Sequence, residues 1–365
     1  MSESMSKSIG KRRIFIYISF TIVLLGSFYL LQRLFMPKFV HGIVEGSLIE
    51  EYYLEEEKDH DVIFIGDCEV YENFSPVTLW ENYGVTSYIR GSAQQLIWQS
   101  YYLLEETLKY ETPEVVVFNV LSMKYDVPQN EAYNRMTLDG MKMSSSKLKS
   151  IKASMMEEEN MIDYLFPLFR YHSRWSELEE DDFKYLFEKK QLFHNGYYMR
   201  ADIKPVTSVP NGKRLPDYKF GDNSYYYLDL MVELCKSKGV ELVLIKAPSI
   251  YPYWYDEWDK QMVEYAEKHD LLYINFLDFI DEAGIDFNTD TYDAGLHLNV
   301  YGAEKLSDYF GKILVDKFNL EDKKNDEELK TIWDEKIEFY NSMKERQLQE
   351  LEEFGYIKGL GNNPR

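Results

Sequence analysis

The residues best suited to chemistry in this chain stand in two places. Cys68, with an acidic residue on either side, is the second residue after the apolar run 62–66, and the pair Asp293 and His297 comes late in the chain. A thiolate is the reactive form of cysteine, and a thiol with a pKa of about 8.5 is mostly protonated at neutral pH, so a histidine or a helix N-terminus must activate it. His297 can accept the thiol proton as a general base, and Asp293 can orient the imidazole. These residue types predict a nucleophilic thiol that attacks an acyl carbonyl.

Three roles for Cys68 are open on the residues alone: a buried core residue at a strand end, half of a disulfide with Cys235, or a nucleophile in a cleft. An exported protein can form disulfides, so the pairing has to be considered. Cys235, however, lies on the apolar face of a predicted helix, which indicates a core position. The charges of Asp67 and Glu69 would raise the pKa of the thiol and oppose the nucleophilic role.

Short apolar runs alternate with helical segments around these residues. The runs are rich in β-branched and aromatic residues and cover 62–66, 85–91, 115–120, 241–248 and 271–278. This alternation is typical of parallel strands joined by crossover helices. We expect a three-layer α/β/α fold with one doubly wound parallel sheet of about five strands. Ligands bind at the carboxyl ends of the strands in such sheets, and Cys68 stands at the first of these ends.

Two segments depart from this alternation within and after a main domain that we place at 61–318. Residues 121–220 interrupt it, and a long, mostly helical insertion at this edge of a sheet predicts a lid or a partner surface. The tail 319–365 is predicted to contain a charged helix with Ile332, Tyr340 and Leu348 toward one side. We expect that helix to dock on the domain, and a handle for another protein is the alternative.

The first 36 residues predict a membrane helix. Residues 14–32 carry no charge and are about long enough to cross a hydrocarbon core. Lys7 and the basic run 11–13 precede them, so the N-terminus is expected to stay in the cytoplasm. A cleaved signal peptide is the competing interpretation, but no small-x-small cleavage site follows. We expect a cytoplasmic stretch over 1–13, a transmembrane signal anchor over 14–36, a connector over 37–60 and an extracytoplasmic main domain at the cell membrane.

The composition argues against some classes of function. A net charge of −22 repels nucleic acid, so we expect no nucleic-acid partner. Aromatic residues make up 16% of the chain and could line a groove for sugar rings, although most are expected in the core. His172 and Arg174 could bind an anionic polymer or be a structural pair. No histidine has a metal-ligand spacing and no glycine-rich phosphate loop is present, so we expect no metal and no cofactor.

Together the two motifs resemble those of the SGNH or GDSL hydrolases. In that family the first strand ends in a Gly-Asp-Ser motif with the nucleophile, a glycine follows the second strand, and a late Asp-x-x-His supplies acid and base. Gly66, Asp67 and Cys68 match the first motif, Gly91 matches the second, and His297 matches the base and precedes a family-like LNxxGAxxLS. The resemblance covers about residues 61–120 and 222–318 and implies a flavodoxin-like sheet.

Three features depart from the family pattern. Cys68 replaces the serine, and Asn119, the counterpart of the family's oxyanion-hole asparagine, lacks the usual preceding glycine. Asp293 and His297 are one residue further apart than in the family, so Asp290 is the reserve candidate for orienting the histidine.

The resemblance implies roles for named residues. These are catalysis by Cys68, His297 and Asp293, an oxyanion hole from Cys68, Gly91 and Asn119, and substrate contacts from Asp67, His172 and Arg174. The chain is also similar in plan to the membrane-anchored branch of the family that works beside membrane-bound O-acyltransferases on cell-envelope polymers. A thioester on cysteine is an activated acyl donor, which suits transfer to a sugar hydroxyl.

We therefore expect a membrane-anchored acyl esterase or O-acyltransferase that acts on a cell-envelope glycan or its acyl ester. The alternative is a catalytically silent domain of the same fold that binds glycan or serves as an accessory subunit of a membrane-bound O-acyltransferase.

Overall fold

The computed structural model describes residues 2–36, 45–55, 58–184, 186–187, 194–209 and 211–358. The chain forms two compact units, one of residues 1–38 and 159–191 and the other of residues 39–158 and 192–365. The second unit carries the sheet.

Five parallel strands form one sheet in the order β2-β1-β3-β4-β5. They are β1 (Val62–Gly66), β2 (Ser87–Gly91), β3 (Val115–Asn119), β4 (Glu241–Lys246) and β5 (Leu272–Asn275). The predicted doubly wound parallel sheet is therefore confirmed. The strand order reverses direction between β1 and β3, and in sheets with this order the ligand crevice opens at that switch point.

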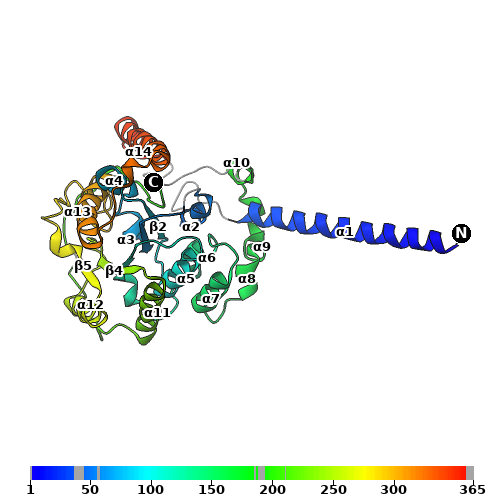
Figure 1. Cartoon of the computed structure of the whole chain (residues 1–365), viewed down its shortest axis with the longest axis horizontal. Helices are drawn as coiled ribbons and strands as arrows, with labels where there is room; N and C mark the ends of the chain where they lie inside the picture. The colour runs from blue at the N-terminus through cyan, green and yellow to red at the C-terminus, as the bar shows by residue number, and fades with distance from the viewer. Residues whose placement is uncertain are drawn as a thin grey trace. The chain divides into compact units, whose positions relative to one another are not determined.

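Helices cover both faces of the sheet (Figure 1), because the side chains of each strand alternate between two hydrophobic cores. In β1, Val62 and Phe64 belong to one core and Ile63 and Ile65 to the other. The first core includes side chains of α4 (Pro76–Tyr83), α13 (Val300–Phe318) and α14 (Glu327–Phe354). The second includes side chains of α5 (Ile97–Thr107), α11 (Asp222–Lys238) and α12 (Asp256–His269). The result is the expected three-layer arrangement.

Local signals explain where these helices begin and end. Ser75 caps α4 by accepting a hydrogen bond from the Thr78 N–H, Pro76 occupies the first turn, and the helix ends at Gly84 in the left-handed conformation. Asn299 caps α13 by accepting from the Tyr301 and Gly302 N–H groups. The cap of α13 thus stands two residues after His297.

Parts of the predicted connector and insertion pack into the larger unit. In the connector, α2 (Glu45–Glu51) and the 3-10 turn η1 (Tyr52–Leu54) bury Ile49 and Tyr52, and Arg90 donates to the Ile49 carbonyl at 2.9 Å. Residues 37–44 and 56–57 of the connector lie outside the described residues. In the insertion, η2 (Val120–Lys124), α6 (Glu131–Leu138) and α7 (Ser145–Ser154) belong to this unit, and α7 packs on α5.

The other insertion residues, 159–191, belong to the smaller unit with α1 (Ser2–Phe35). They form α8 (Met161–Leu165), α9 (Pro167–Tyr171), η3 (His172–Ser176) and α10 (Glu180–Lys184). Residues 185, 188–193 and 210 lie outside the described residues. Within α1, the stretch Lys11–Phe35 is long and apolar enough to cross a membrane, as an anchor or a signal sequence would be, and its side chains are not buried.

The C-terminal tail begins with the short turn η5 (Lys323–Asn325), and α14 follows it. Trp333 is fully buried and stacks on Trp80, with ring centroids 5.1 Å apart. Tyr340 is buried as well, whereas Ile332 is only half-buried and Leu348 is exposed, so the packed face is centred on Trp333. Residues 359–365 of the tail lie outside the described residues.

Candidate active site

Cys68 lies at the turn by which the chain leaves β1. A Cβ on Gly66 would approach Val70 Cγ2 to 2.5 Å, so the turn requires glycine. Asp67 then caps α3 (Cys68–Tyr71) by accepting a hydrogen bond from the Glu69 N–H at 3.2 Å. Cys68 is the first helical residue and stands at the carboxyl edge of the sheet, at the predicted position.

Asp293 holds His297 by two hydrogen bonds. Its Oδ1 accepts from the His297 backbone N–H at 2.8 Å, and its Oδ2 lies 2.7 Å from Nδ1 of the ring. Three residues separate Asp293 from His297, one more than in the Asp-x-x-His pattern. Ala294 and Gly295, with φ of 65° and 94°, form a left-handed turn that accommodates this longer spacing. Thr291 closes this turn, because its hydroxyl accepts from the Gly295 N–H and donates to the His297 carbonyl. The longer spacing therefore leaves the Asp–His contact intact.

The Cys68 thiol and the His297 side chain interact with each other. Charge and hydrogen-bonding interactions between the two groups shift the pKa of each, so the thiol lies within reach of the imidazole. Nε2 of His297 is buried and has no hydrogen-bond partner among the described residues. Catalytic hydrogen bonds are often loose until substrate binds.

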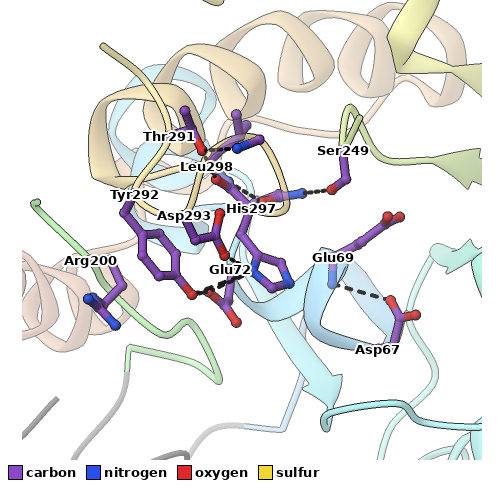
Figure 2. Close-up of polar contacts among 12 residues, drawn as sticks. Asp67, Glu69, Glu72, Arg200, Ser249, Thr291, Tyr292, Asp293, His297 and Leu298 are labelled. Carbon is purple, nitrogen blue, oxygen red and sulfur yellow. Dashed lines mark hydrogen bonds and ion pairs between the residues drawn. The ribbon is translucent and has the colours of Figure 1, made fainter. Parts of the chain in front are cut away.

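A second carboxylate, Glu72, faces the same imidazole. Its Oε2 lies 3.6 Å from Nδ1 of His297 and accepts a hydrogen bond from the Tyr292 hydroxyl. The guanidinium carbon of Arg200 lies 4.3 Å from the centre of the Tyr292 ring. Figure 2 shows Asp293, Glu72 and Tyr292 gathered at one side of the His297 ring. Sequence reasoning missed Glu72, and the available signal was its position four residues after Cys68, about one helical turn away.

These carboxylates control the charge of His297. Burial alone would lower the pKa of the imidazole, but the neighbouring Glu72 carboxylate, then Cys68 and the hydrogen bond to Asp293, outweigh burial and hold this pKa well above the ordinary 6.5. The protonated ring is therefore favoured at neutral pH.

The thiol of Cys68 is itself hard to ionise. Burial raises its pKa to about 11, and the Asp67 and Glu72 carboxylates act in the same direction, while His297 lowers it. The helix that begins at Cys68 has only four residues, so it offers little of the dipole that lowers thiol pKa values at longer helices. The resting pair thus consists of a thiol and an imidazolium.

Glu69 is neutralised by a buried partner. Both of its carboxylate oxygens lie 2.9 Å from Nζ of Lys246, and neither side chain is exposed to solvent. Among the two acids that flank Cys68 it is Asp67, and not Glu69, that raises the pKa of the thiol.

Asn119, at the end of β3, joins the two flanking acids. Its Nδ2 donates to Asp67 and to Glu69, each at 3.0 Å, and its Oδ1 accepts from the Ala247 N–H. Both hydrogens of the amide are therefore used, which leaves no donor for an oxyanion. The expected oxyanion role does not fit this arrangement, because the amide holds together the ends of β1, β3 and β4.

Asp67 and Gly91 lie on either side of the Cys68 turn. Burial, and then the charge of Glu69, raise the pKa of Asp67 to about 6. Gly91 pairs with Gly66, and a Cβ on Gly91 would approach the Gly66 carbonyl oxygen to 3.1 Å and that of Asp67 to 3.4 Å. The backbone of Gly91 therefore runs directly beside the backbone of the Cys68 turn.

The reserve candidate, Asp290, forms an ion pair with Lys305. Its buried carboxylate lies 2.6 Å from Nζ of Lys305 and accepts from the Asp286 N–H at 2.8 Å. Asp293 is thus the aspartate that orients His297.

The remaining predicted residues make other contacts. His172 and Arg174 belong to the smaller unit, where Nδ1 of His172 lies 2.8 Å from the Phe169 carbonyl oxygen and Arg174 pairs with Asp182. Cys235 is buried in α11, and both it and Cys68 are free thiols, so the disulfide considered from the sequence is not formed. Among the described residues, no group of three or more His, Cys, Asp or Glu side chains is arranged to hold a metal ion.

Comparisons with known proteins give structural similarity only. No family model matches the chain, and no curated protein is similar to it in sequence. Similar solved structures include a proposed acylhydrolase from Bacteroides fragilis, which shares 12% identity over 72% of this chain and 89% of its own, with a TM-score of 0.36. A proposed lipolytic protein of the G-D-S-L family from Desulfitobacterium hafniense shares 13% identity over 71% and 100%, with a TM-score of 0.34. A GDSL-like lipase from Bacteroides thetaiotaomicron shares 13% identity over 71% and 88%, with a TM-score of 0.32.

Proposed function

We propose that this chain is a membrane-anchored, SGNH-like acyl esterase or O-acyltransferase that acts on a cell-envelope carbohydrate outside the cytoplasm. One observation carries the proposal: an imidazole held by Asp293 interacts with the thiol of Cys68, which stands at the carboxyl edge of the sheet. Thiol, imidazole and carboxylate in this order are the parts of a nucleophile, a base and its orienting group.

The proposed reaction has two steps. In molecules whose His297 ring is neutral, the Cys68 sulfur attacks the acyl carbonyl as its proton passes to the free nitrogen of that ring, a thioester forms, and the departing alcohol takes the proton back from the imidazolium. In the second step a sugar hydroxyl or water gives its proton to His297 and attacks the thioester, so that the acyl group leaves and the thiol is restored. The backbone N–H groups of Cys68 and Gly91 are the proposed donors to the oxyanion, and each such donor is worth roughly 3–4 kcal/mol where measured.

Two substitutions test this mechanism. Hydrolysis of a chromogenic acetate by the purified full-length chain should fall at least about a hundredfold in Cys68→Ala and in His297→Ala, because each removes a group that forms bonds in the reaction. Cys235→Ala is the matched control, since it removes the other free thiol and should leave the rate unchanged. Mass spectrometry after a brief reaction should find one acyl group on the peptide that contains Cys68. Equal rates in the wild type and both site variants would refute the mechanism.

The second candidate is a catalytically silent domain that binds glycan or assists a membrane-bound O-acyltransferase. The raised pKa of Cys68, about 11, favours it, because a thiol that stays protonated is a poor nucleophile. This candidate predicts no acyl group on Cys68 and an unchanged glycan affinity in Cys68→Ala.

A further inference from the structure

We propose that residues 161–175 enter the lipid bilayer beside α1 as a second membrane contact; this inference rests on the proposed membrane anchoring. The contact surface, called here the apolar patch, consists of Ile162, Phe166, Phe169 and Trp175. All four side chains belong to the smaller unit and are exposed.

The first argument is the depth at which the apolar patch meets α1. The ring of Phe28 lies 5.7 Å from that of Phe166 and 6.3 Å from that of Phe169, measured between centroids. Phe28 is inside the stretch that can cross a membrane, about 6 Å of helix rise before Gln32, where the uncharged run ends. If lipid surrounds Phe28, it also reaches the two rings that pack against it.

The second argument is the outward face of these rings. Ile162 is 52% exposed, Phe166 38% and Phe169 50%, although both phenylalanines already contact α1. Ile162 lies in α8, Phe169 lies in α9, and Phe166 lies at the junction between these two helices. Large exposed apolar surfaces next to a membrane-spanning helix are typical of lipid contact.

The third argument is the polar end of the segment. Arg174 donates to the Phe35 carbonyl at the end of α1 and pairs with Asp182, and Trp175 beside it is 72% exposed. Tryptophan and arginine are enriched at the level of the lipid head groups, where the ring meets the apolar side and the charge meets water. The order from Phe169 to Trp175 thus follows the order from hydrocarbon to head group.

The backbone of the segment is compatible with this position. The Phe166 N–H donates to the Ile162 carbonyl at 2.8 Å, and the Phe169 N–H donates to the Phe166 carbonyl at 2.9 Å. Peptide groups near hydrocarbon must be hydrogen-bonded within the protein, and these are.

Nitroxide depth measurements on the full-length chain in phospholipid nanodiscs test the proposal. Single cysteines at Phe169, Leu24 and Glu177, in a background with Cys68→Ser and Cys235→Ser, are labelled, and collisions with oxygen and with a water-soluble nickel chelate are counted. Leu24 lies in the uncharged run of α1 and Glu177 is an exposed residue of the smaller unit, so they report lipid and water. The label at 169 should collide with nickel as rarely as the label at 24 does. It should collide with oxygen more often than the label at 177 does. Circular dichroism of each labelled variant checks the fold.

Each other outcome has a definite meaning. If nickel reaches the label at 169 as readily as the label at 177, while the label at 24 is in lipid, the inference is overturned but the proposed membrane anchoring by α1 still holds. A label at 169 that neither reagent reaches means that a protein covers the apolar patch, which also overturns the inference. A label at 24 that is open to nickel refutes the membrane anchoring itself.

Discussion

At the scale of single residues, the charge on His297 decides whether Cys68 can react. Glu72 and Asp293 both favour the imidazolium, and Glu72 also opposes ionisation of the thiol. A protonated ring cannot accept the thiol proton, so the proposed activity should increase as the pH rises from neutral and the imidazolium loses its proton. In the proposed mechanism, Glu72 therefore lowers the rate at neutral pH, because it favours the form of His297 that cannot accept a proton.

The variant Glu72→Gln should increase the proposed activity at neutral pH. Removing the carboxylate lowers the pKa of His297 and that of Cys68, so the rise of kcat/KM with pH should move to lower pH by roughly one unit. Glutamine can still accept the Tyr292 hydrogen bond, and Tyr292→Phe is the control that keeps the charge of Glu72. A pH–rate profile of Glu72→Gln that coincides with that of the wild type would show that Glu72 does not set the protonation of the pair.

At the scale of elements, α14 supports the segment that leads to the site. The Gln347 amide donates to the Met199 carbonyl and accepts from the Ala201 N–H, and Arg200, between those two residues, lies against Tyr292. The stack of Trp333 on Trp80 fixes α14 on α4. The tail helix is therefore part of the packed domain.

The variant Trp333→Ala should destabilise the fold by about 3–5 kcal/mol, because it leaves a cavity where a fully buried ring stood. Asp334→Ala is the matched control on the same helix: it removes an exposed ion pair with Lys330 and should cost at most about 1 kcal/mol. Thermal or urea unfolding of the full-length chain in detergent measures both. Similar stability of the two variants would mean that α14 is dispensable for the fold.

At the scale of the whole molecule, the candidate active site and the candidate membrane helix belong to different compact units. The larger unit holds the sheet and the candidate active site, and the smaller unit holds α1 and the apolar patch. The basic residues ahead of the apolar run favour a cytoplasmic N-terminus, which would put the acidic remainder outside.

Protease treatment of intact spheroplasts tests this topology. An epitope tag at the N-terminus should be retained and one at the C-terminus should be lost, whereas both should be lost after the membrane is opened with detergent. A C-terminal tag that survives in intact spheroplasts would place the domain in the cytoplasm. A product that lacks the N-terminal tag before any treatment would identify α1 as a cleaved signal peptide.

The amino-acid sequence was sufficient to predict the alternation of strands and helices along the chain and the location of Cys68 at a strand end. Both follow from local patterns: apolar runs such as 62–66 form buried strands, and residues such as Ser75 and Gly84 mark the ends of helices. The contact between Asp293 and His297 could also be predicted, because the two residues are only four positions apart in the sequence.

The surroundings of the thiol could not be predicted in this way, because they depend on how the chain folds. Glu72 faces His297, Lys246 neutralises Glu69, and Asn119 gives both amide hydrogens to carboxylates, although 177 residues separate Lys246 from Glu69 and 50 separate Asn119 from it. The physical reason is that charge interactions, hydrogen bonds and burial depend on distances in space. The spacing of residues along the chain can nominate Cys68 and His297, but the pKa of each group is set by neighbours that only folding brings together.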